Sequence, residues 1–155
     1  MSIRKGEVKD LPRLLELIQE LAIYEREPDA VKVTVEELER DGFGEHPLFG
    51  FFVAEEAGEI VGIAHYYYRY STWNGKVLYL EDLIVTEAQR GKGYGKKLLD
   101  RIIQQAAADN CRLCTWQVLD WNEPSIEFYK KIGANLDEEW INCTVKAEDY
   151  HRFTD

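Results

Sequence analysis

The stretch Tyr79-Leu80-Glu81-Asp82-Leu83-Ile84-Val85, followed by Arg90-Gly91-Lys92-Gly93-Tyr94-Gly95-Lys96, decides the fold of this chain. The first part is typical of an apolar strand, here with two adjacent carboxylates. The second part is a loop of three glycines and three cations that opens a helix. Glycines let a backbone approach a ligand closely, and the free N–H groups at a helix start attract anions. The pattern therefore predicts a pyrophosphate-binding loop at residues 90–96, shortly after the carboxylate pair.

Two common phosphate loops do not match this pattern. A Walker loop requires a serine or threonine after its Gly-Lys pair, but here Lys96 is followed by Lys97. A Rossmann fingerprint requires a third glycine where Lys96 stands, and an acidic residue about 20 residues further on, where Asn110 and Cys111 stand. The pattern Arg90-x-x-Gly93-x-Gly95 remains. Its structural alternative is a plain glycine-rich turn before an amphipathic helix.

Length and composition narrow the class of protein. The chain has 155 residues, which suits one domain over residues 1–155. A net charge of −10 argues against nucleic acid as a partner and favours, weakly, a cationic small substrate. We expect no membrane partner, because no apolar run approaches the length of a span and no signal peptide is evident. Three cysteines suit a reducing cytoplasm. Histidines and cysteines show no metal-ligand spacing, so no metal is expected.

Hydrophobic periodicity and turn residues predict an α+β fold. Helices are expected over residues 11–22, 35–41, 95–108 and 123–131, and a short helix in the tail. Asp10, Thr34 and Asn122 are the expected N-caps of the first, second and fourth of these helices, and Gly133 ends the fourth. Strands are expected at residues 3–4, 51–55, 60–70, 76–85, 112–119, 135–136 and 141–145. The strand–helix–strand unit over residues 76–119 implies a parallel pair within a mixed sheet, flanked by helices. Ligands bind beyond the carboxyl ends of such strands, which is where the glycine loop and residues 120–122 lie.

The chain resembles the GCN5-related N-acetyltransferase (GNAT) superfamily. The pattern Arg90-x-x-Gly93-x-Gly95 is similar to the pyrophosphate loop of that superfamily. Residues 122–134, Asn-Glu-Pro-Ser-Ile-x-Phe-Tyr-Lys-x-x-Gly-Ala, resemble the polyamine and thialysine N-acetyltransferase branch. Further similar blocks lie at residues 20–25, 41–47, 70–76 and 79–82, so that the resemblance covers nearly the whole chain in order.

The resemblance implies an enzyme in which a primary amine attacks acetyl-CoA directly within a ternary complex, without a metal. Glu81 matches the residue that accepts the amine proton through water, and Tyr129 matches the acid that protonates the CoA sulfur. From the residues alone, Tyr129 shares a helix face with Ser125, and packing is its plain alternative. The implied acetyl-CoA contacts are Leu83, Ile84, Val85, Arg90, Gly91, Lys92, Gly93, Tyr94, Gly95, Lys96, Asn122 and Ser125. Members of the branch are homodimers, so a homodimer is expected.

The resemblance also suggests how the amine is bound. The matching positions are Tyr24, Glu25, Ser71, Trp73, Glu81, Asp82 and Trp140. The polyamine enzymes typically have Asp-Pro-Trp where this chain has Ser71-Thr72-Trp73, a form that resembles the thialysine-type enzymes. This favours a thialysine-like amino acid or short diamine. Spermidine or spermine, a protein lysine or amino terminus, and a CoA-sensing role without catalysis are the alternatives.

Overall fold

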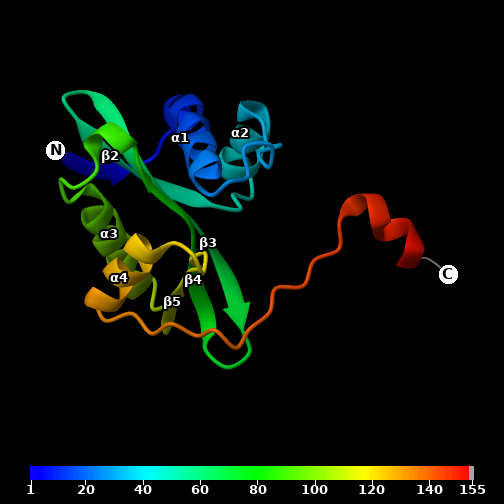
Figure 1. Cartoon of the computed structure of the whole chain (residues 1–155). Helices are drawn as coiled ribbons and strands as arrows, with labels where there is room; N and C mark the ends of the chain where they lie inside the picture. Colours follow the sequence, from blue (N-terminus) through cyan, green and yellow to red (C-terminus); the bar gives the residue numbers. More distant parts are fainter. Residues whose placement is uncertain (154–155) are drawn as a thin grey trace. The chain divides into compact units, whose positions relative to one another are not determined.

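The computed structural model describes residues 1–153 and contains two compact units, Met1–Gln117 and Val118–Asp155. The described part of the first unit holds a five-stranded sheet of order β1-β2-β3-β4-β5 (Figure 1). Its strands are β1 (Ser2–Lys5), β2 (Gly50–Glu56), β3 (Glu59–Ser71), β4 (Gly75–Val85) and β5 (Leu113–Thr115). Neighbours pair antiparallel except β4 and β5, which are parallel. The predicted α+β class and mixed sheet are confirmed, while a single domain over the whole chain stays a prediction.

Helices cover both faces of this sheet. Helices α1 (Leu11–Tyr24) and α2 (Val35–Phe43) lie on one face (Figure 1). The core there joins leucines of both helices to apolar side chains of β2, β3 and β4: Leu11, Leu14, Leu17, Leu38, Phe51, Val53, Ile63 and Ile84. Helix α3 (Tyr94–Ala108) buries Leu98, Leu99 and Ile102. Its Arg101 stacks over the Phe52 ring of β2 at 4.4 Å, which places α3 on the opposite face.

Two short 3-10 helices and the caps complete the first unit. The turns Val8–Asp10 and Glu87–Gln89 precede α1 and the glycine loop, respectively. Thr34 caps α2 as predicted, because its hydroxyl accepts from Glu37 N and the Glu37 carboxylate accepts from Thr34 N. Asp10 occupies the N-cap position of α1, but the prediction that its side chain caps the helix is wrong.

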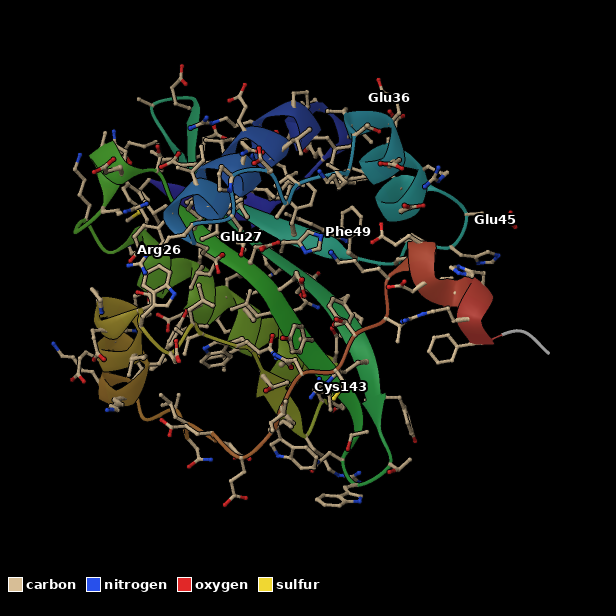
Figure 2. All side chains as sticks on the ribbon, turned by 45° about the vertical axis from the view of Figure 1, so that its right-hand side comes forward. Arg26, Glu27, Glu36, Glu45, Phe49 and Cys143 are labelled. Carbon is tan, nitrogen blue, oxygen red and sulfur yellow. The ribbon has the colours of Figure 1, made fainter. Side chains whose placement is uncertain are left out.

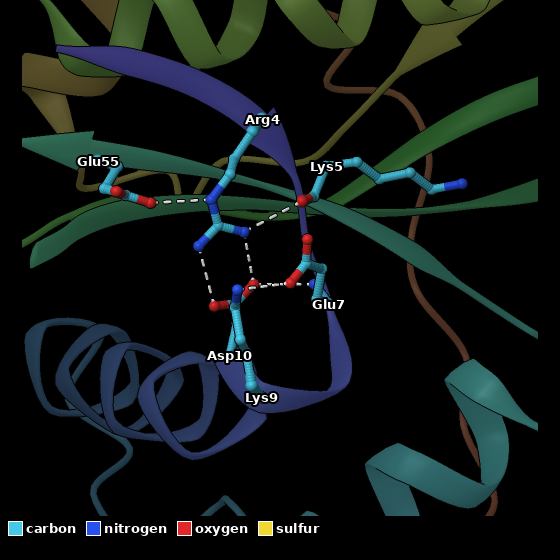
Figure 3. Close-up of polar contacts among 6 residues, drawn as sticks. All are labelled: Arg4, Lys5, Glu7, Lys9, Asp10 and Glu55. Atoms are coloured by element: carbon cyan, nitrogen blue, oxygen red, sulfur yellow. Dashed lines mark hydrogen bonds and ion pairs between the residues drawn. The ribbon is translucent and has the colours of Figure 1, made fainter. Parts of the chain in front are cut away.

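The Asp10 carboxylate binds Arg4 and the backbone of Glu7 instead of capping α1 (Figure 3). It accepts two hydrogen bonds from the Arg4 guanidinium at 2.7 and 3.0 Å, and one from Glu7 N at 2.8 Å. Arg4 also donates to Glu55 at 2.8 Å. A nearly buried carboxylate is stabilised more by a bidentate guanidinium than by a backbone N–H of a helix start, because the guanidinium supplies a compensating positive charge as well as hydrogen bonds. The network joins β1, β2 and the start of α1.

Two strand predictions are corrected by the structure. The strand expected at residues 112–119 is shorter, since β5 pairs with Val77–Tyr79 of β4 and stops at Thr115. In the second unit, the strands expected near residues 135–136 and 141–145 are absent from the described chain, which is irregular over residues 134–146. The largest apolar side chains of the second predicted strand region remain exposed, 78% for Trp140 and 87% for Ile141. Alternating apolar residues form a strand only when a sheet supplies hydrogen bonds and a face to cover.

The rest of the second unit follows the sequence more closely. Helix α4 (Glu123–Lys131) begins at Asn122, whose Oδ1 accepts from Ser125 N at 3.4 Å. It ends at Lys131, and Gly133, two residues later, has the positive φ of 87° that favours glycine after a helix. The tail forms a 3-10 helix, Ala147–Phe153, where a short helix was possible.

Candidate active site

The site begins at an irregularity in β4. Asp82 pairs with His65 of β3, but Leu80 pairs with Tyr66, the next residue along, so Glu81 is an extra residue without a cross-strand partner. This is a β-bulge, which re-aims the side chains that follow it. Asp82 and Ile84 both point to the face of the sheet that α1 covers. Leu80 points to the α3 face, so strict alternation from Leu80 onward would have put Asp82 and Ile84 on the α3 face too. The bulge thus presents two consecutive carboxylates at one place.

A third carboxylate joins them from α1. Glu25 follows the last residue of that helix, and the chain then turns away through Arg26 and Glu27 (Figure 2). Burial and the nearby negative charge of Glu81 raise the pKa of Glu25. Burial, with Glu81 and Glu25 as further causes, raises the pKa of Asp82 to about 7. Like charges held together in a partly dry place raise one another's pKa values, and a bound cation relieves that repulsion.

Aromatic and imidazole rings surround the acids. The rings of Tyr67 on β3 and Tyr79 on β4 lie 5.2 Å apart, and burial and the Glu81 charge raise the pKa values of both phenols. Phe49, on the segment that enters β2 (Figure 2), packs 4.5 Å from the His65 ring. An acidic patch walled by aromatic faces suits an organic ammonium. The sequence reasoning did not select Phe49, His65, Tyr67 or Tyr79. The polar His65 within an apolar strand was the one available signal.

The strand edge next to the acids is open. β5 pairs with β4 no further than Tyr79, so residues 82–85 of β4 are paired on one side only, with residues 62–65 of β3. Ile84 is buried in the core, while Leu83 and Val85 are half-buried. An unpaired strand edge offers backbone N–H and C=O groups to an extended ligand. The predicted backbone role of Leu83, Ile84 and Val85 is compatible with this edge.

The glycine loop lies directly beyond that edge and opens α3. Gly91 and Gly93 have φ values of 77° and 85°, which explains why glycines stand there. A Cβ at either position would meet no protein atom within 4 Å, so the loop faces open space. The first N–H groups of α3, from Tyr94, Gly95 and Lys96, have no carbonyl partner within the helix. Backbone donors and open space at the start of a 15-residue helix fit a pyrophosphate.

The cations of the loop already have partners in the protein. Arg90 donates to Val85 O at 3.0 Å and its guanidinium lies 5.2 Å over the Tyr24 ring. Lys92 donates to Gln89 at 2.7 Å, and Lys96 contacts Asp100 at 2.7 Å. Arg90 therefore supports the loop against the end of α1, next to Glu25. Tyr94 is buried, so a contact of this residue with a ligand would use its backbone.

Two predicted amine-binding residues lie away from the acids. Ser71 ends β3, and its hydroxyl accepts from Trp73 N at 3.2 Å and Asn74 N at 3.1 Å, so it builds the β3–β4 turn. Trp73 is 86% exposed. Ser71 is six residues from His65 along β3, roughly 20 Å at the usual rise per residue. The first unit gathers Glu25, Glu81 and Asp82, with Tyr24 beside Arg90, but not Ser71 or Trp73.

The remaining predicted residues belong to the second unit. Tyr129 is 9% exposed on α4, and its ring lies 5.4 Å from that of Phe128. Ser125 lies one turn earlier on the same helix, and Asn122 is the N-cap of that helix. Trp140 lies in the irregular segment. Among residues 1–153, no three histidine, cysteine, aspartate or glutamate side chains are grouped as metal ligands, and no helix combines the length and apolarity needed to cross a membrane.

Comparison with known proteins identifies the family. The model of the acetyltransferase (GNAT) family matches residues 11–134. A spermidine/spermine N(1)-acetyltransferase-like protein from Homo sapiens is 43% identical over 89% of this chain, which spans 21% of that protein's length. Thialysine N-epsilon-acetyltransferases from Sus scrofa and Bos taurus are 38% and 41% identical, in each case over 97% of this chain and 89% of the relative.

Solved structures agree in fold. An integron cassette protein from the V. cholerae mobile metagenome superposes with a TM-score of 0.79 at 24% identity, covering 98% of this chain and 96% of the other. An aminoglycoside N-acetyltransferase in complex with CoA superposes with a TM-score of 0.72 at 21% identity, covering 94% and 100%. The family match over most of the chain, together with the thialysine enzymes, shows that this protein belongs to the GNAT family of acetyltransferases.

Proposed function

We propose that this acetyltransferase transfers the acetyl group of acetyl-CoA to a primary amine of a small cationic substrate. One observation carries the proposal. Three carboxylates, Glu25, Glu81 and Asp82, meet beside an open strand edge that leads straight into the glycine loop. A cation site and an anion site thus lie at the two ends of one short stretch of β4, which is the arrangement that an amine and a CoA ester require.

The acids bind the amine as an ammonium. Glu25 and Asp82 have raised pKa values because they are buried near other negative charge, and a positive charge among them would relieve that repulsion. The faces of Tyr67 and Tyr79 favour the alkyl carbons and the charge of the same group.

Glu81 removes the proton that blocks the attack. An alkylammonium has a pKa near that of lysine, about 10.4, so it is almost fully protonated at neutral pH. Glu81 is the exposed member of the cluster, and the bulge separates it from the β3 ladder. It accepts the ammonium proton through a water, which leaves a free lone pair on nitrogen.

Acetyl-CoA, when bound, supplies the thioester that the amine attacks. The backbone of residues 83–85 hydrogen-bonds the extended arm and the acetyl carbonyl, where N–H groups stabilise the developing oxyanion. The N–H groups of residues 91–96 hold the pyrophosphate, and Asn122 and Ser125 add contacts. Tyr129 donates its phenol proton to the departing sulfur.

The substrate proposed is a thialysine-like amino acid or a short diamine. It is supported by the names of the thialysine relatives and by Ser71-Thr72-Trp73, which lacks a carboxylate at the β3–β4 turn. Spermidine or spermine is the second candidate, favoured by the name of the human relative. The proposal includes a cytoplasmic homodimer, supported by three free cysteines and by the exposed Trp140 and Ile141.

The experiment is a set of initial rates of CoA release from acetyl-CoA. The amines are thialysine, lysine, ornithine, putrescine, spermidine and a lysine-containing peptide, with Tyr129→Phe and Glu81→Gln assayed in parallel. We expect thialysine to give the highest kcat/KM and both variants to lose about 10²–10⁴-fold in kcat. A preference for spermidine would overturn the proposed substrate class but leave the proposed acetyl-transfer mechanism in place. Binding of acetyl-CoA without turnover of any free amine would overturn the proposed function.

A further inference from the structure

The His65 imidazole lies opposite Asp82, one of the three carboxylates of the acid cluster (Glu25, Glu81 and Asp82), and one of its ring nitrogens makes no hydrogen bond among residues 1–153. His65 faces Asp82 across β3 and β4, and its side chain is 12% exposed. Its Nδ1 is buried and has no hydrogen-bond partner among residues 1–153. The Asp82 Oδ2 lies 3.9 Å away, beyond hydrogen-bond length but within reach of a small rotation or one water. Leaving a buried polar atom unpaired costs about 1–3 kcal/mol, so such an atom requires an explanation.

The ring is neutral and held in place. Burial lowers the pKa of His65 to about 4, so at physiological pH the imidazole carries one N–H donor and one acceptor nitrogen. Phe49 packs at 4.5 Å and limits the rotation of the ring. Because a carboxylate faces Nδ1, the tautomer with the proton on Nδ1 is the one that fits this site.

Asp82 is the carboxylate that most needs such a donor. Glu81 on its own strand and Glu25 at the end of α1 are both negative, and together with burial they raise its pKa to about 7. The Tyr79 phenol, also near Asp82, is neutral near pH 7, since a phenol has an ordinary pKa of about 10 and burial raises the pKa of Tyr79 further. Part of the Asp82 population is therefore protonated at neutral pH, and a protonated carboxyl cannot pair with an ammonium.

We infer that His65 is a positioning residue of the amine site, whose Nδ1–H turns to Asp82 and holds that carboxylate ionised and aimed at the substrate ammonium. The inference rests on the function proposed above. No proton leaves the imidazole, since the ring acts only as a hydrogen-bond donor. The bond shortens when the ammonium binds, because a fully ionised Asp82 is then the favoured form.

Kinetics over pH separate this role from simple packing. In His65→Leu, which removes the donor but keeps an apolar side chain, the pKa of Asp82 rises further. We expect the KM for the amine to increase about tenfold at pH 7 with kcat within about twofold, and the defect to fall below about twofold at pH 9. His65→Gln, which retains an N–H donor, should recover part of the loss. The exposed His46→Leu is the matched control and should behave as wild type.

A defect that is the same at pH 7 and pH 9, or the absence of a defect, overturns the inference. A second measurement does not depend on turnover. Nitrogen NMR of the three histidines in the substrate-free protein, assigned with His65→Leu, reports the tautomer of His65. We expect a protonated Nδ1 whose signal shifts as Asp82 titrates, and loss of that step in Asp82→Asn. If wild type acetylates no amine but shows this step, the proposed function fails and the pairing stands. An unprotonated Nδ1, or a signal indifferent to Asp82→Asn, removes the pairing itself.

Discussion

The Thr86 hydroxyl donates a hydrogen bond to the Glu20 carboxylate, with 3.0 Å between the two oxygens. Glu20 also accepts from Glu87 N at 2.9 Å and lies 3.9 Å from the Arg90 guanidinium. One side chain of α1 therefore holds three successive parts of the segment between β4 and the glycine loop. Glu25 follows the last residue of the same helix, so α1 connects the three carboxylates to the glycine loop.

Replacing Glu20 by alanine should weaken both ligands at once. The loop loses its anchor and α1 loses its tie to the loop, so we expect the Kd for acetyl-CoA and the KM for the amine each to rise several-fold, with a smaller loss in kcat. Calorimetric titration and initial rates measure these effects. The control is Glu16→Ala on the same helix, where an exposed carboxylate pairs with Arg13 at 2.8 Å. Equal effects from the two variants would contradict the anchoring role.

Asp82→Asn should stabilise the fold while it impairs amine binding. A carboxyl whose pKa is raised from 3.8 to about 7 in the native state makes the protein less stable as the pH rises through that interval. Removing the charge should add about 2–4 kcal/mol to the free energy of unfolding at pH 8 and close to nothing below pH 4. Urea unfolding at several pH values tests this, and a gain independent of pH would argue against it.

Arg4→Ala should destabilise the protein strongly. The variant leaves the Asp10 carboxylate, 4% exposed, without its guanidinium, and a buried uncompensated charge costs about 3–5 kcal/mol. Arg4 holds the pKa of Asp10 below its usual range, so its stabilising effect is complete above pH 4 and fades at lower pH. The exposed pair of Arg40 and Asp41, 2.9 Å apart, gives the control: Arg40→Ala should change stability by less than about 0.5 kcal/mol.

Two loop glycines should respond differently to alanine. Gly93 has a φ of 85°, so Gly93→Ala strains the backbone by about 1 kcal/mol and should lower stability and acetyl-CoA affinity together. At Gly95 a Cβ would meet its nearest protein atom, Val85 Cγ2, at 3.9 Å, which is ordinary contact. Gly95→Ala should therefore keep both thermal stability and acetyl-CoA affinity, which makes it the matched control for Gly93→Ala. Thermal unfolding and calorimetric titration measure both effects, and equal losses in the two variants would contradict the strain argument.

Local signals predicted much of this fold. The capping box at Thr34 and Glu37, the glycine at position 133 and the strand–helix–strand unit each depend on a few neighbouring residues, and all appear in the structure. The strand predicted at residues 141–145 failed because pairing depends on a partner that the sequence does not reveal. The resemblance predicts Glu25 in the amine site, and burial, together with the negative charge of Glu81, raises the pKa of Glu25. The sequence did not indicate His65 as a site residue, because its role depends on which residue of β4 lies opposite it. The apolar residues 77–80 that precede the bulge give no sign of that pairing.

The extra residue in β4 separates the fate of the acid pair from that of the core. Leu80 pairs with Tyr66 and Asp82 with His65, so deleting Glu81 would leave two regular neighbouring pairs, with Asp82 still on the α1 face and Ile84 still in the hydrophobic core. A chain that lost the juxtaposed acids by such a deletion would therefore keep its core packing. Selection for a stable protein alone does not preserve the two adjacent acids, and a lineage released from selection for the activity can lose the pair without losing the fold.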